Sequence, residues 1–320
     1  MYPHDGMPYY GIFVREQEEA IRRWHPDVEF LIEYIDGVAD KLDYLKSIPR
    51  IIKRIKKENI DLVHIHYGFS GLFLLAMHRC PVPVLVTLHG GDIQSEQGKY
   101  VQVFFTRMIL KRANAAIILN EPMRSLVTPL VKAVFSIPCS VNTETFQPSH
   151  NRTETDHKLI VFPSDRNRWV KDYPLFEKVI SELRSKYGLK CETSEVKGMS
   201  RVQVAELYQK ADLMLMTSIS EGSPQVVKEA MACNLPVVST PVGDVAYLLD
   251  GVQDSFVASS RSPEELAHLC MKSFERTGSG VKGRQRITQL NLDDKNTAQQ
   301  IYQIYQDLLQ KSKCKHISIQ

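Results

Sequence analysis

The sequence predicts an α/β protein of two similar halves, each built on a parallel β-sheet covered by helices. The chain has 320 residues, which is too many for one ordinary hydrophobic core and enough for two domains of about 150 residues each. Short apolar, β-branched runs alternate with helical patterns, which is the order of βαβ units. The alternation stops in a polar stretch at residues 147–157 and then starts again, so the two halves join there.

The expected elements follow from apolar periodicity and from the proline and glycine residues that bound each run. In the first half we expect helices at 13–20, 45–57 and 100–111 and strands at 61–66, 82–88 and 115–119. In the second half we expect strands at 158–162, 211–216 and 235–239 and helices at 173–187, 225–233 and 263–276. A last helix, 296–309, has a one-sided apolar stripe that must pack on another element. We therefore expect domains at 1–148 and 155–293 and a helix at 294–312 that crosses back to the N-terminal domain.

The first half begins without the strand that a doubly wound domain normally places near the centre of its sheet. Residues 2–11 are rich in proline and glycine, and a helical pattern follows at once. We expect this first strand to be missing, and we expect Gly6 and Gly11 to belong to the loop that would follow it.

Composition is that of a soluble globular protein, with 43% hydrophobic and 24% charged residues. The net charge of +3 is too small to indicate nucleic acid as a partner. Six scattered cysteines with no Cys-x-x-Cys pair favour reduced thiols in a cytoplasmic protein over disulfides or zinc. No apolar run reaches the roughly 20 residues of a membrane span, and the N-terminus lacks an export signal. We expect a cytoplasmic protein whose only membrane contact is peripheral, at the inner face.

The strongest local signal is the segment from Thr217 to Glu229, TSISEGSPQVVKE, which lies between an expected strand and an expected helix. Ser223 is a natural N-cap, and Pro224 suits the first helical position. The helix then presents free N–H groups and a positive dipole end to a ligand, which favours an anion such as a diphosphate. Glu221 lies before the helix and Glu229 inside it, so both carboxylates can face one ligand at different depths.

The spacing of these two glutamates carries little information alone, since about one such pair is expected by chance in a chain of this size. Their position across a strand–loop–helix junction is what favours a functional site over two solvated surface glutamates. A second junction follows at residues 240–244, where Gly243 lets the backbone approach a phosphate closely.

The segment EGSPQVVKEAMACNLPVVSTPVGDVAYLL resembles the donor-site signature of the retaining family 4 glycosyltransferases, which have the GT-B fold. The resemblance extends over nearly the whole chain through IDLVHIHYG, VTLHGGDIQ, SIPCSVNTETFQP and VFPSDRNRWVKDYPL. It implies two Rossmann-like domains facing across a cleft. It also implies transfer of a sugar from a nucleoside diphosphate sugar to an acceptor hydroxyl with retention of configuration, commonly in polysaccharide or glycolipid biosynthesis.

The same resemblance assigns roles on the donor side. Glu221 faces the transferred sugar as the catalytic carboxylate, and Glu229 holds the ribose hydroxyls. Lys171, with Arg166 or Arg168, neutralises the departing diphosphate. The helix start and the second junction complete the donor site with Gly222, Ser223, Pro224 and Gly243. Cations and helix N-termini stabilise a leaving diphosphate without a metal, so no metal or other cofactor is expected.

On the acceptor side, the resemblance assigns His89 to catalysis, reaching the donor sugar from the loop after strand 82–88. A structural histidine at a strand end is the alternative. Asp92 is either an acceptor-side group or an N-cap, with equal weight. His64 and His66 alternate on a buried strand and are interpreted as core or cleft-wall residues, because no third metal ligand is evident. The loops of this side hold two glycines, Gly11 and Gly90.

Two residues depart from the family pattern at the junction between the halves. Ser140 stands where the interdomain motif has glycine, and Asn142 stands where it has aspartate. These departures affect the local geometry and not the chemistry. The missing first strand matters more, because the loop after it normally closes over the diphosphate.

Residues 46–57 place six Lys or Arg side chains around four isoleucines. One interpretation is peripheral docking of Lys46–Lys57 on an anionic membrane. The favoured one is an ordinary amphipathic helix that covers the sheet with a solvated basic face. Pro49 predicts that the helix proper starts near that residue.

The partners expected are a nucleotide-sugar donor and a sugar, lipid-linked or small-molecule acceptor. Two other functions remain open. A nucleotide-sugar 2-epimerase would need an additional acid/base set, which the sequence does not reveal. A non-catalytic, nucleotide-binding partner subunit of a glycosyltransferase complex agrees with the short N-terminus but not with the retention of Glu221, Glu229, Lys171 and His89.

Overall fold

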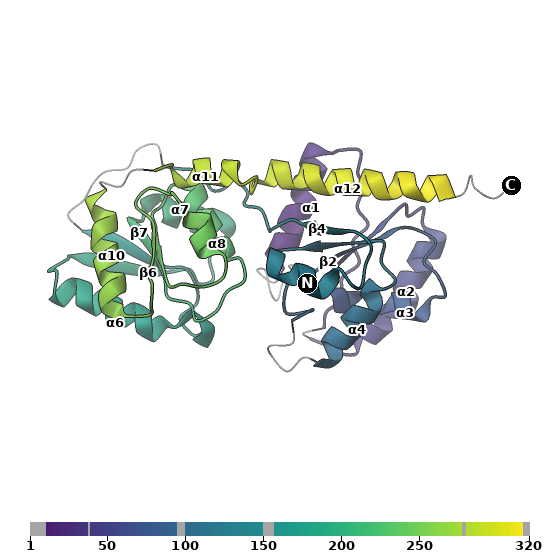
Figure 1. Ribbon diagram of the computed structural model, residues 1–320, viewed down its shortest axis with the longest axis horizontal. Coiled ribbons are helices and arrows are strands. Elements are labelled where there is room, and N and C mark those ends of the chain that lie inside the picture. The colour runs from purple at the N-terminus through teal and green to yellow at the C-terminus, as the bar shows by residue number, and fades with distance from the viewer. Residues whose placement is uncertain (1–10, 38, 95–99, 150–156, 277–279, 316–320) are drawn as a thin grey trace. The chain divides into compact units, whose positions relative to one another are not determined.

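The computed structural model describes residues 11–37, 39–94, 100–149, 157–276 and 280–315. The chain divides into two compact units (Figure 1). Unit 1 consists of Met1–Cys139 and Lys295–Gln320, and unit 2 of Ser140–Asp294. Gly6 and most of the polar stretch expected at the junction lie outside the described residues.

Unit 1 is built on a four-stranded parallel sheet in the order β1-β2-β3-β4. The strands are β1 (Val63–His66), β2 (Val84–Thr87), β3 (Ala115–Ile118) and β4 (Val134–Ser136). β2 and β3 are fully buried because helices cover both faces, which explains their continuous apolar sequence. The three strands expected from the sequence are present, each one to three residues shorter, and β4 is an addition.

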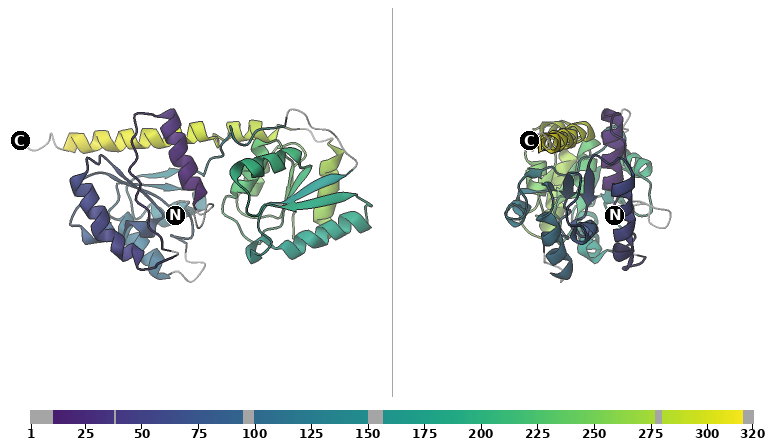
Figure 2. Two further views of the ribbon diagram at one scale, coloured as in Figure 1. Left: turned by 180° about the vertical axis from the view of Figure 1, so that it is seen from behind. Right: turned by 90° about the vertical axis from the view of Figure 1, so that its right-hand side faces the viewer.

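Helices cover both faces of this sheet (Figure 2), and alternate residues of its strands belong to two different core clusters. Leu85 and Ile117 pack with α1 (Ile12–Trp24) and α12 (Asp294–Lys315). Val86 and Ile118 lie in the cluster on the opposite face. That face is covered by α2 (Asp43–Lys57), α3 (Phe73–Ala76), α4 (Tyr100–Leu110) and the short η1 (Gly68–Gly71), with η2 (Glu121–Met123) and α5 (Arg124–Val127) following β3.

The C-terminal helix α12 packs on unit 1 with the apolar stripe identified in the sequence. Ile301, Ile304 and Tyr305 are buried against α1 and the sheet. His25 and Tyr302 stack with ring centroids 3.9 Å apart, which fixes α12 beside the end of α1. The last helix therefore crosses back to the N-terminal domain, as expected.

Unit 2 contains a five-stranded parallel sheet in the order β6-β5-β7-β8-β9. The strands are β5 (Lys158–Phe162), β6 (Cys191–Glu195), β7 (Leu213–Met216), β8 (Val237–Ser239) and β9 (Phe256–Val257). One face carries α6 (Tyr173–Ser185) and α10 (Pro263–Glu275). The other carries α7 (Arg201–Lys210), α8 (Gln225–Ala232), α9 (Val245–Leu249) and α11 (Gly283–Gln289).

The strand order of unit 2 reverses at β5. The chain goes from β5 to β6 through α6 and returns through α7 to β7 on the other side of β5. The loops that follow β5 and β7 therefore lead to helices on opposite faces of the sheet. Such a reversal leaves a crevice at the carboxyl ends of the two strands, and open α/β sheets bind ligands there.

α2 contradicts the expectation that the helix starts near Pro49, because it begins at Asp43 and includes the proline. Pro49 has no N–H for the carbonyl of Leu45, one turn earlier. Leu45 is 58% exposed, so water can reach that end of the helix and replace the missing donor. None of the helices in the described ranges is long and apolar enough to cross a membrane.

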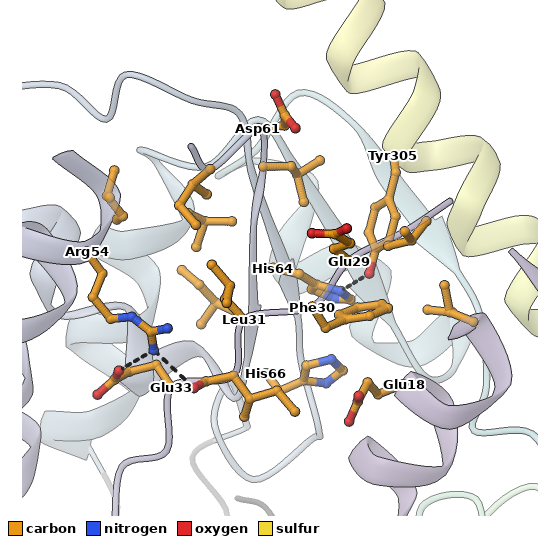
Figure 3. A pocket seen from close by; sticks show the side chains of 18 of the residues that line it. Glu18, Glu29, Phe30, Leu31, Glu33, Arg54, Asp61, His64, His66 and Tyr305 are labelled. Atoms are coloured by element: carbon orange, nitrogen blue, oxygen red, sulfur yellow. Dashed lines mark hydrogen bonds and ion pairs between the residues drawn. The ribbon is translucent and has the colours of Figure 1, made fainter. Parts of the chain in front are cut away.

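A cavity of about 580 Å³ lies beside β1 in unit 1 (Figure 3). β1 pairs with β2 on one edge, and no strand of the described residues pairs with its other edge. Residues 28–35, which have no regular structure, form the opposite wall, and Tyr302 and Tyr305 of α12 border it. The cavity thus lies where a further strand would pair with β1.

Candidate active site

Two oppositely charged side chains meet at the strand reversal of unit 2. Lys171, at the end of η3 (Trp169–Lys171) after β5, forms an ion pair with Glu221, which lies in the loop after β7. Their side chains are only 10% and 15% exposed. Ser218 donates a hydrogen bond to the same oxygen, Glu221 Oε1, at 2.7 Å. The first of the paired glutamates and the phosphate-side lysine from the sequence therefore lie in one site.

The backbone that carries Lys171 is held by a residue of the facing loop. The Thr217 hydroxyl lies 3.0 Å from the carbonyl oxygens of both Lys171 and Asp172. Asp172 has a left-handed conformation with φ +48° and is the N-cap of α6, where its carboxylate accepts the N–H of Leu175. The loop after β5 is thereby fixed to the loop after β7 rather than left to solvent.

Arg261 reinforces this junction from the start of α10. Its guanidinium donates to the carbonyl oxygens of Thr217 and Ser218, and it pairs with the carboxylate of Asp172. The sequence analysis missed both Thr217 and Arg261 as positioning residues. No local motif marks them, because their partners lie 43–89 residues away along the chain.

The helix α8 starts at Gln225, the first residue of the expected range 225–233, but its cap differs from the expectation by one residue. The helix begins at Gln225 with Pro224 as its N-cap, so the expected Ser223 cap and the first-position Pro224 are both wrong. Proline can take the extended backbone of a cap (ψ 117°) but offers no side-chain oxygen, and no side-chain cap hydrogen bond forms. The first N–H groups of α8 are therefore without the cap that Ser223 would have supplied.

Several polar atoms around this helix start are buried without a hydrogen-bond partner among the described residues: Ser223 Oγ, Gln225 Oε1 and Asp244 Oδ1. Such atoms cost free energy unless a ligand or water pairs with them. A hydroxyl donor and two carbonyl-type acceptors suit a ligand that carries both anionic oxygens and hydroxyl groups.

Gly243 is required by the loop that it contacts. It has φ +54°, and a Cβ at this position would lie 2.4 Å from the carbonyl oxygen of Gly222. The next N–H, of Asp244, donates to that same oxygen at 3.1 Å. The second junction thus packs directly on the Glu221–Gly222 backbone, so the close approach that needs a glycine is one between two loops.

Glu229 is 2% exposed and pairs with Arg201 at the start of α7, Oε1 to Nη2 at 2.7 Å. The Arg201 guanidinium also lies over the ring of Phe146, 4.7 Å from its centroid. Arg201 was missed by the sequence analysis, because α7 was not among the expected helices although a capping box of Ser200 and Gln203 marks its start. Glu229 therefore presents a carboxylate of fixed orientation.

The two arginines expected near the diphosphate lie on the surface. Arg166 pairs with Glu195, Nε to Oε2 at 3.0 Å, and its guanidinium lies 5.0 Å from the Tyr173 ring centroid. Its side chain is 51% exposed. Arg168 is the N-cap residue of η3 and is also exposed. The backbone carbonyl of Arg168 accepts the N–H of Lys171 at 2.9 Å, but no guanidinium contact from Arg166 or Arg168 reaches Glu221 among the described residues. In this structure Lys171 is therefore the cation that meets Glu221.

In unit 1, His89 lies in the loop after β2, as expected. Its Nε2 is 3.4 Å from His66 Nδ1, and its ring contacts Phe13 at the start of α1 with centroids 4.8 Å apart. Its other ring nitrogen, Nδ1, is buried without a partner in the described part of the chain. Burial holds the pKa of His89 well below its usual value, so the ring is neutral at pH 7.

Asp92 is fully buried and binds backbone rather than capping a helix. It accepts the N–H groups of Gly68 at 2.8 Å and His89 at 3.0 Å, and so holds the loops after β1 and β2 together. Burial raises its pKa to about 6, although the backbone donors favour the ionised form. Two glycines shape the neighbouring backbone, Gly90 with φ +90° and Gly11, the N-cap of α1, with φ +70°.

His64 and His66 are buried side chains of β1. Both ring nitrogens of His64 are used, with Tyr305 Oη and Thr87 Oγ1 each at 2.7 Å. His64 therefore belongs to the packing of α12 on the sheet, and it has no nitrogen free for a metal. The described residues include no group of three or more His, Cys, Asp or Glu side chains that could hold a metal ion.

Three of the six cations of α2 are engaged in ion pairs: Lys46 with Asp40, Arg50 with Glu33 and Asp43, and Arg54 with Glu33 and Glu58. The helix also covers the sheet through Ile48, Ile51, Ile52 and Ile55. This arrangement agrees with the favoured interpretation of α2 as a covering helix with a basic outer face.

Comparison with known proteins accounts for both units. Residues 169–275 match the family described as "Glycosyl transferases group 1", and residues 12–145 match "Glycosyltransferase Family 4". The chain is similar to an uncharacterized glycosyltransferase of Methanocaldococcus jannaschii, with 23% identity over 81% of this chain and 83% of that protein. It is also similar to the putative teichuronic acid biosynthesis glycosyltransferase TuaC of Bacillus subtilis, with 25% identity over 81% and 77%.

Solved structures share the fold. Sucrose-phosphate synthase from Thermosynechococcus elongatus matches with a TM-score of 0.73 and 19% identity, over 97% of this chain and 96% of that one. Anabaena HepE in complex with UDP and glucose matches with a TM-score of 0.67 and 14% identity, over 92% and 95%. The two parallel-sheet domains are those of the GT-B fold.

Proposed function

The chain belongs to the group 1, family 4 glycosyltransferases, and from that premise we propose that it transfers a sugar from a nucleoside diphosphate sugar to an acceptor hydroxyl with retention of anomeric configuration. The bond between the anomeric carbon and the diphosphate breaks, and a bond from that carbon to the acceptor oxygen forms. The nucleoside diphosphate leaves with the electron pair, and its departing phosphate oxygen takes up the proton that the acceptor hydroxyl loses.

The observation that carries the proposal is the Lys171–Glu221 ion pair at the strand reversal of unit 2. A largely buried ion pair adds little to stability, since desolvation offsets most of its attraction. Its place at the strand reversal, where open α/β sheets bind ligands, supports a functional role. Lys171 would stabilise the charge that develops on the leaving diphosphate, and Glu221 would face the sugar.

The start of α8 supports the diphosphate assignment. Its uncapped N–H groups and positive dipole end attract an anion, and Ser223 Oγ offers a donor without another partner in the described residues. Together with Lys171 they supply positive potential without a metal ion. We therefore propose a transfer that needs no metal.

Glu229 would bind the ribose hydroxyls, since a buried carboxylate accepts two hydroxyl donors well. Arg201 supports the role by fixing the orientation of that carboxylate. In unit 1, the neutral His89, with one ring nitrogen lacking a partner among the described atoms, would serve the reaction from the acceptor side.

The acceptor class is proposed from the relatives. Their names include teichuronic acid biosynthesis, an Escherichia coli galactosyltransferase that acts on GlcNAc-diphosphoundecaprenol, and a phosphatidylinositol N-acetylglucosaminyltransferase subunit of Arabidopsis thaliana. These names point to a polysaccharide, a lipid-linked sugar and a phospholipid as acceptors. We propose a sugar or lipid-linked sugar acceptor, in polysaccharide or glycolipid biosynthesis.

The test is an incubation with uridine, guanosine and thymidine diphosphate sugars, each with free-sugar and lipid-linked acceptors. We expect one donor to release its nucleoside diphosphate together with a new glycoside whose anomeric configuration, read by NMR, matches the donor. A donor epimerised at C2 without any acceptor would identify a 2-epimerase. Tight nucleotide binding without turnover would identify a non-catalytic subunit.

A further inference from the structure

The outward side of α4 in unit 1 is apolar where a surface helix is normally polar. Tyr100, Val101, Phe104 and Met108 are 69%, 70%, 59% and 40% exposed. Their spacing places them on one side of the helix, while Ile109 and Leu110 on the other side are buried against the sheet. A helix that is apolar on both sides has a second partner besides the core.

Two further exposed apolar side chains lie at the start of α2. Leu42 and Leu45 are each 58% exposed. A chain of ring contacts joins the two helices beneath the surface: Tyr44 meets Phe69 with centroids 4.7 Å apart, and Phe69 meets Phe105 at 6.1 Å. We call the six exposed side chains Leu42, Leu45, Tyr100, Val101, Phe104 and Met108 the α4 surface.

The charges of this region are mainly positive. Residues 97–120 contain four Lys or Arg and no Asp or Glu. Arg107 and Lys111 are exposed on the same side of α4 as Phe104 and Met108, one and two turns further along. Residues 40–112 as a whole carry twelve Lys or Arg against six Asp or Glu. A binding partner with an apolar interior and a negatively charged surface would match both the exposed apolar side chains and the excess of positive charge.

We propose that the α4 surface docks on an anionic lipid membrane, with α4 lying in the plane of the headgroups. Phe104, Val101 and Met108 enter the acyl boundary, where amphipathic helices bury their apolar face about 5–10 Å deep. Tyr100 lies at the headgroup level, and Arg107 and Lys111 extend toward the lipid phosphates. This location differs from the basic face of α2, three of whose cations already have protein partners. Docking is independent of the sugar-transfer reaction and concerns unit 1 alone.

The experiment is co-sedimentation of the full chain with vesicles of phosphatidylcholine alone or mixed three to one with phosphatidylglycerol. Wild type is expected to sediment with the anionic vesicles and to remain in solution with the neutral ones. Val101→Ser combined with Phe104→Ser should lower the partition coefficient at least tenfold. Arg107→Gln combined with Lys111→Gln should lower it by roughly fivefold per charge and reduce its salt dependence.

Matched controls remove exposed apolar side chains elsewhere: Leu31→Ser (58% exposed) in unit 1 and Tyr247→Ser (62% exposed) in unit 2. Both should bind vesicles as wild type does. An unchanged thermal midpoint shows that each variant is folded. The proposal is overturned if wild type ignores anionic vesicles, if the serine variants bind as wild type, or if wild type is a dimer that Phe104→Ser dissociates. The last result would make the α4 surface a protein interface.

Discussion

Lys171 and Glu221 form an ion pair across fifty residues of sequence because the loops after β5 and β7 meet where the strand order of unit 2 reverses. Two neighbouring side chains hold the pair in position. Thr217 binds the backbone carbonyl of Lys171, and Ser218 donates to Glu221. Substitutions that move this backbone should therefore alter catalysis without touching a ligand.

Thr217→Val tests the backbone support. Valine keeps the shape but leaves the carbonyls of Lys171 and Asp172 without the hydroxyl donor. We expect a loss of about 1–3 kcal/mol in the free energy of unfolding and a fall in kcat of roughly tenfold with little change in KM. Urea unfolding and steady-state kinetics measure both. Thr288→Val, at an exposed threonine, is the control and should change neither.

Gly243→Ala tests the contact between the two loops. The new Cβ would lie 2.4 Å from the Gly222 carbonyl oxygen at a φ of +54°. We expect the free energy of unfolding to fall by about 2–4 kcal/mol, because backbone strain and overpacking add up. We also expect a loss of transfer activity. Gly251→Ala is the control, because a Cβ at Gly251 would have no atom within 4 Å and only the φ of +69° would be strained. This variant should lose only about 1 kcal/mol in the free energy of unfolding. Equal losses for the two variants would argue against a specific loop contact.

A double-mutant cycle on Glu229 and Arg201 tests whether this pair is a coupled unit. The Glu229 side chain is 2% exposed and that of Arg201 22% exposed. We expect a coupling free energy of about 1–3 kcal/mol in unfolding, and a raised KM for the nucleotide sugar in Glu229→Ala. The more exposed pair Arg166–Glu195 serves as the reference and should couple by less than about 1 kcal/mol. A larger coupling free energy for Arg166–Glu195 than for Arg201–Glu229 would mean that Glu229 has no fixed orientation.

The histidine cluster of unit 1 predicts loss of stability in acid. Burial holds the pKa values of His64 and His89 well below 6.5 and lowers that of His66 to about 3. Below pH 6.5 the unfolded chain takes up protons that the folded chain excludes, so stability falls by up to about 1.4 kcal/mol per pH unit for each histidine. Asp92 acts in the opposite direction. Its pKa is raised to about 6, so the folded chain binds a proton that the unfolded chain does not bind as the pH falls from 6 toward 4. Asp92 thereby offsets the loss of stability that one of the three histidines causes.

Urea midpoints at pH 7.5 and 5.5 measure this effect. Wild type should be less stable at pH 5.5, and His64→Gln should show a smaller difference between the two pH values. His268→Gln, at an exposed histidine of unit 2, should leave the difference unchanged. A wild-type protein equally stable at both pH values would contradict the burial of neutral histidines.

Much of the fold could be predicted from the sequence, because strongly apolar, β-branched runs mark buried parallel strands. β6 (Cys191–Glu195) was missed because it contains Glu, Thr and Ser and lies at the edge of the sheet, where exposed positions carry no apolar signal. The N-cap of α8 was misplaced by one residue, because the prediction followed the preference of serine for that position and the structure has Pro224 there.

The candidate site was predicted less completely. Lys171, Glu221 and Glu229 were found from local patterns and resemblance. Their partners Arg201, Thr217 and Arg261 were not, because these contacts depend on the order of the strands, which no single segment encodes. The same limit applied to Arg166, whose partner Glu195 comes from the unpredicted β6.

The central claim is that unit 2 binds a nucleoside diphosphate sugar beside Lys171 and uses Glu221 on the sugar. The most direct measurement compares kcat with nucleoside diphosphate affinity by calorimetry in wild type, Glu221→Gln and Lys171→Met. We predict that Glu221→Gln lowers kcat by at least roughly 100-fold and keeps or strengthens nucleotide binding, since Lys171 is released, while Lys171→Met weakens binding. Wild-type turnover in Glu221→Gln, or wild-type affinity in Lys171→Met, would contradict the account.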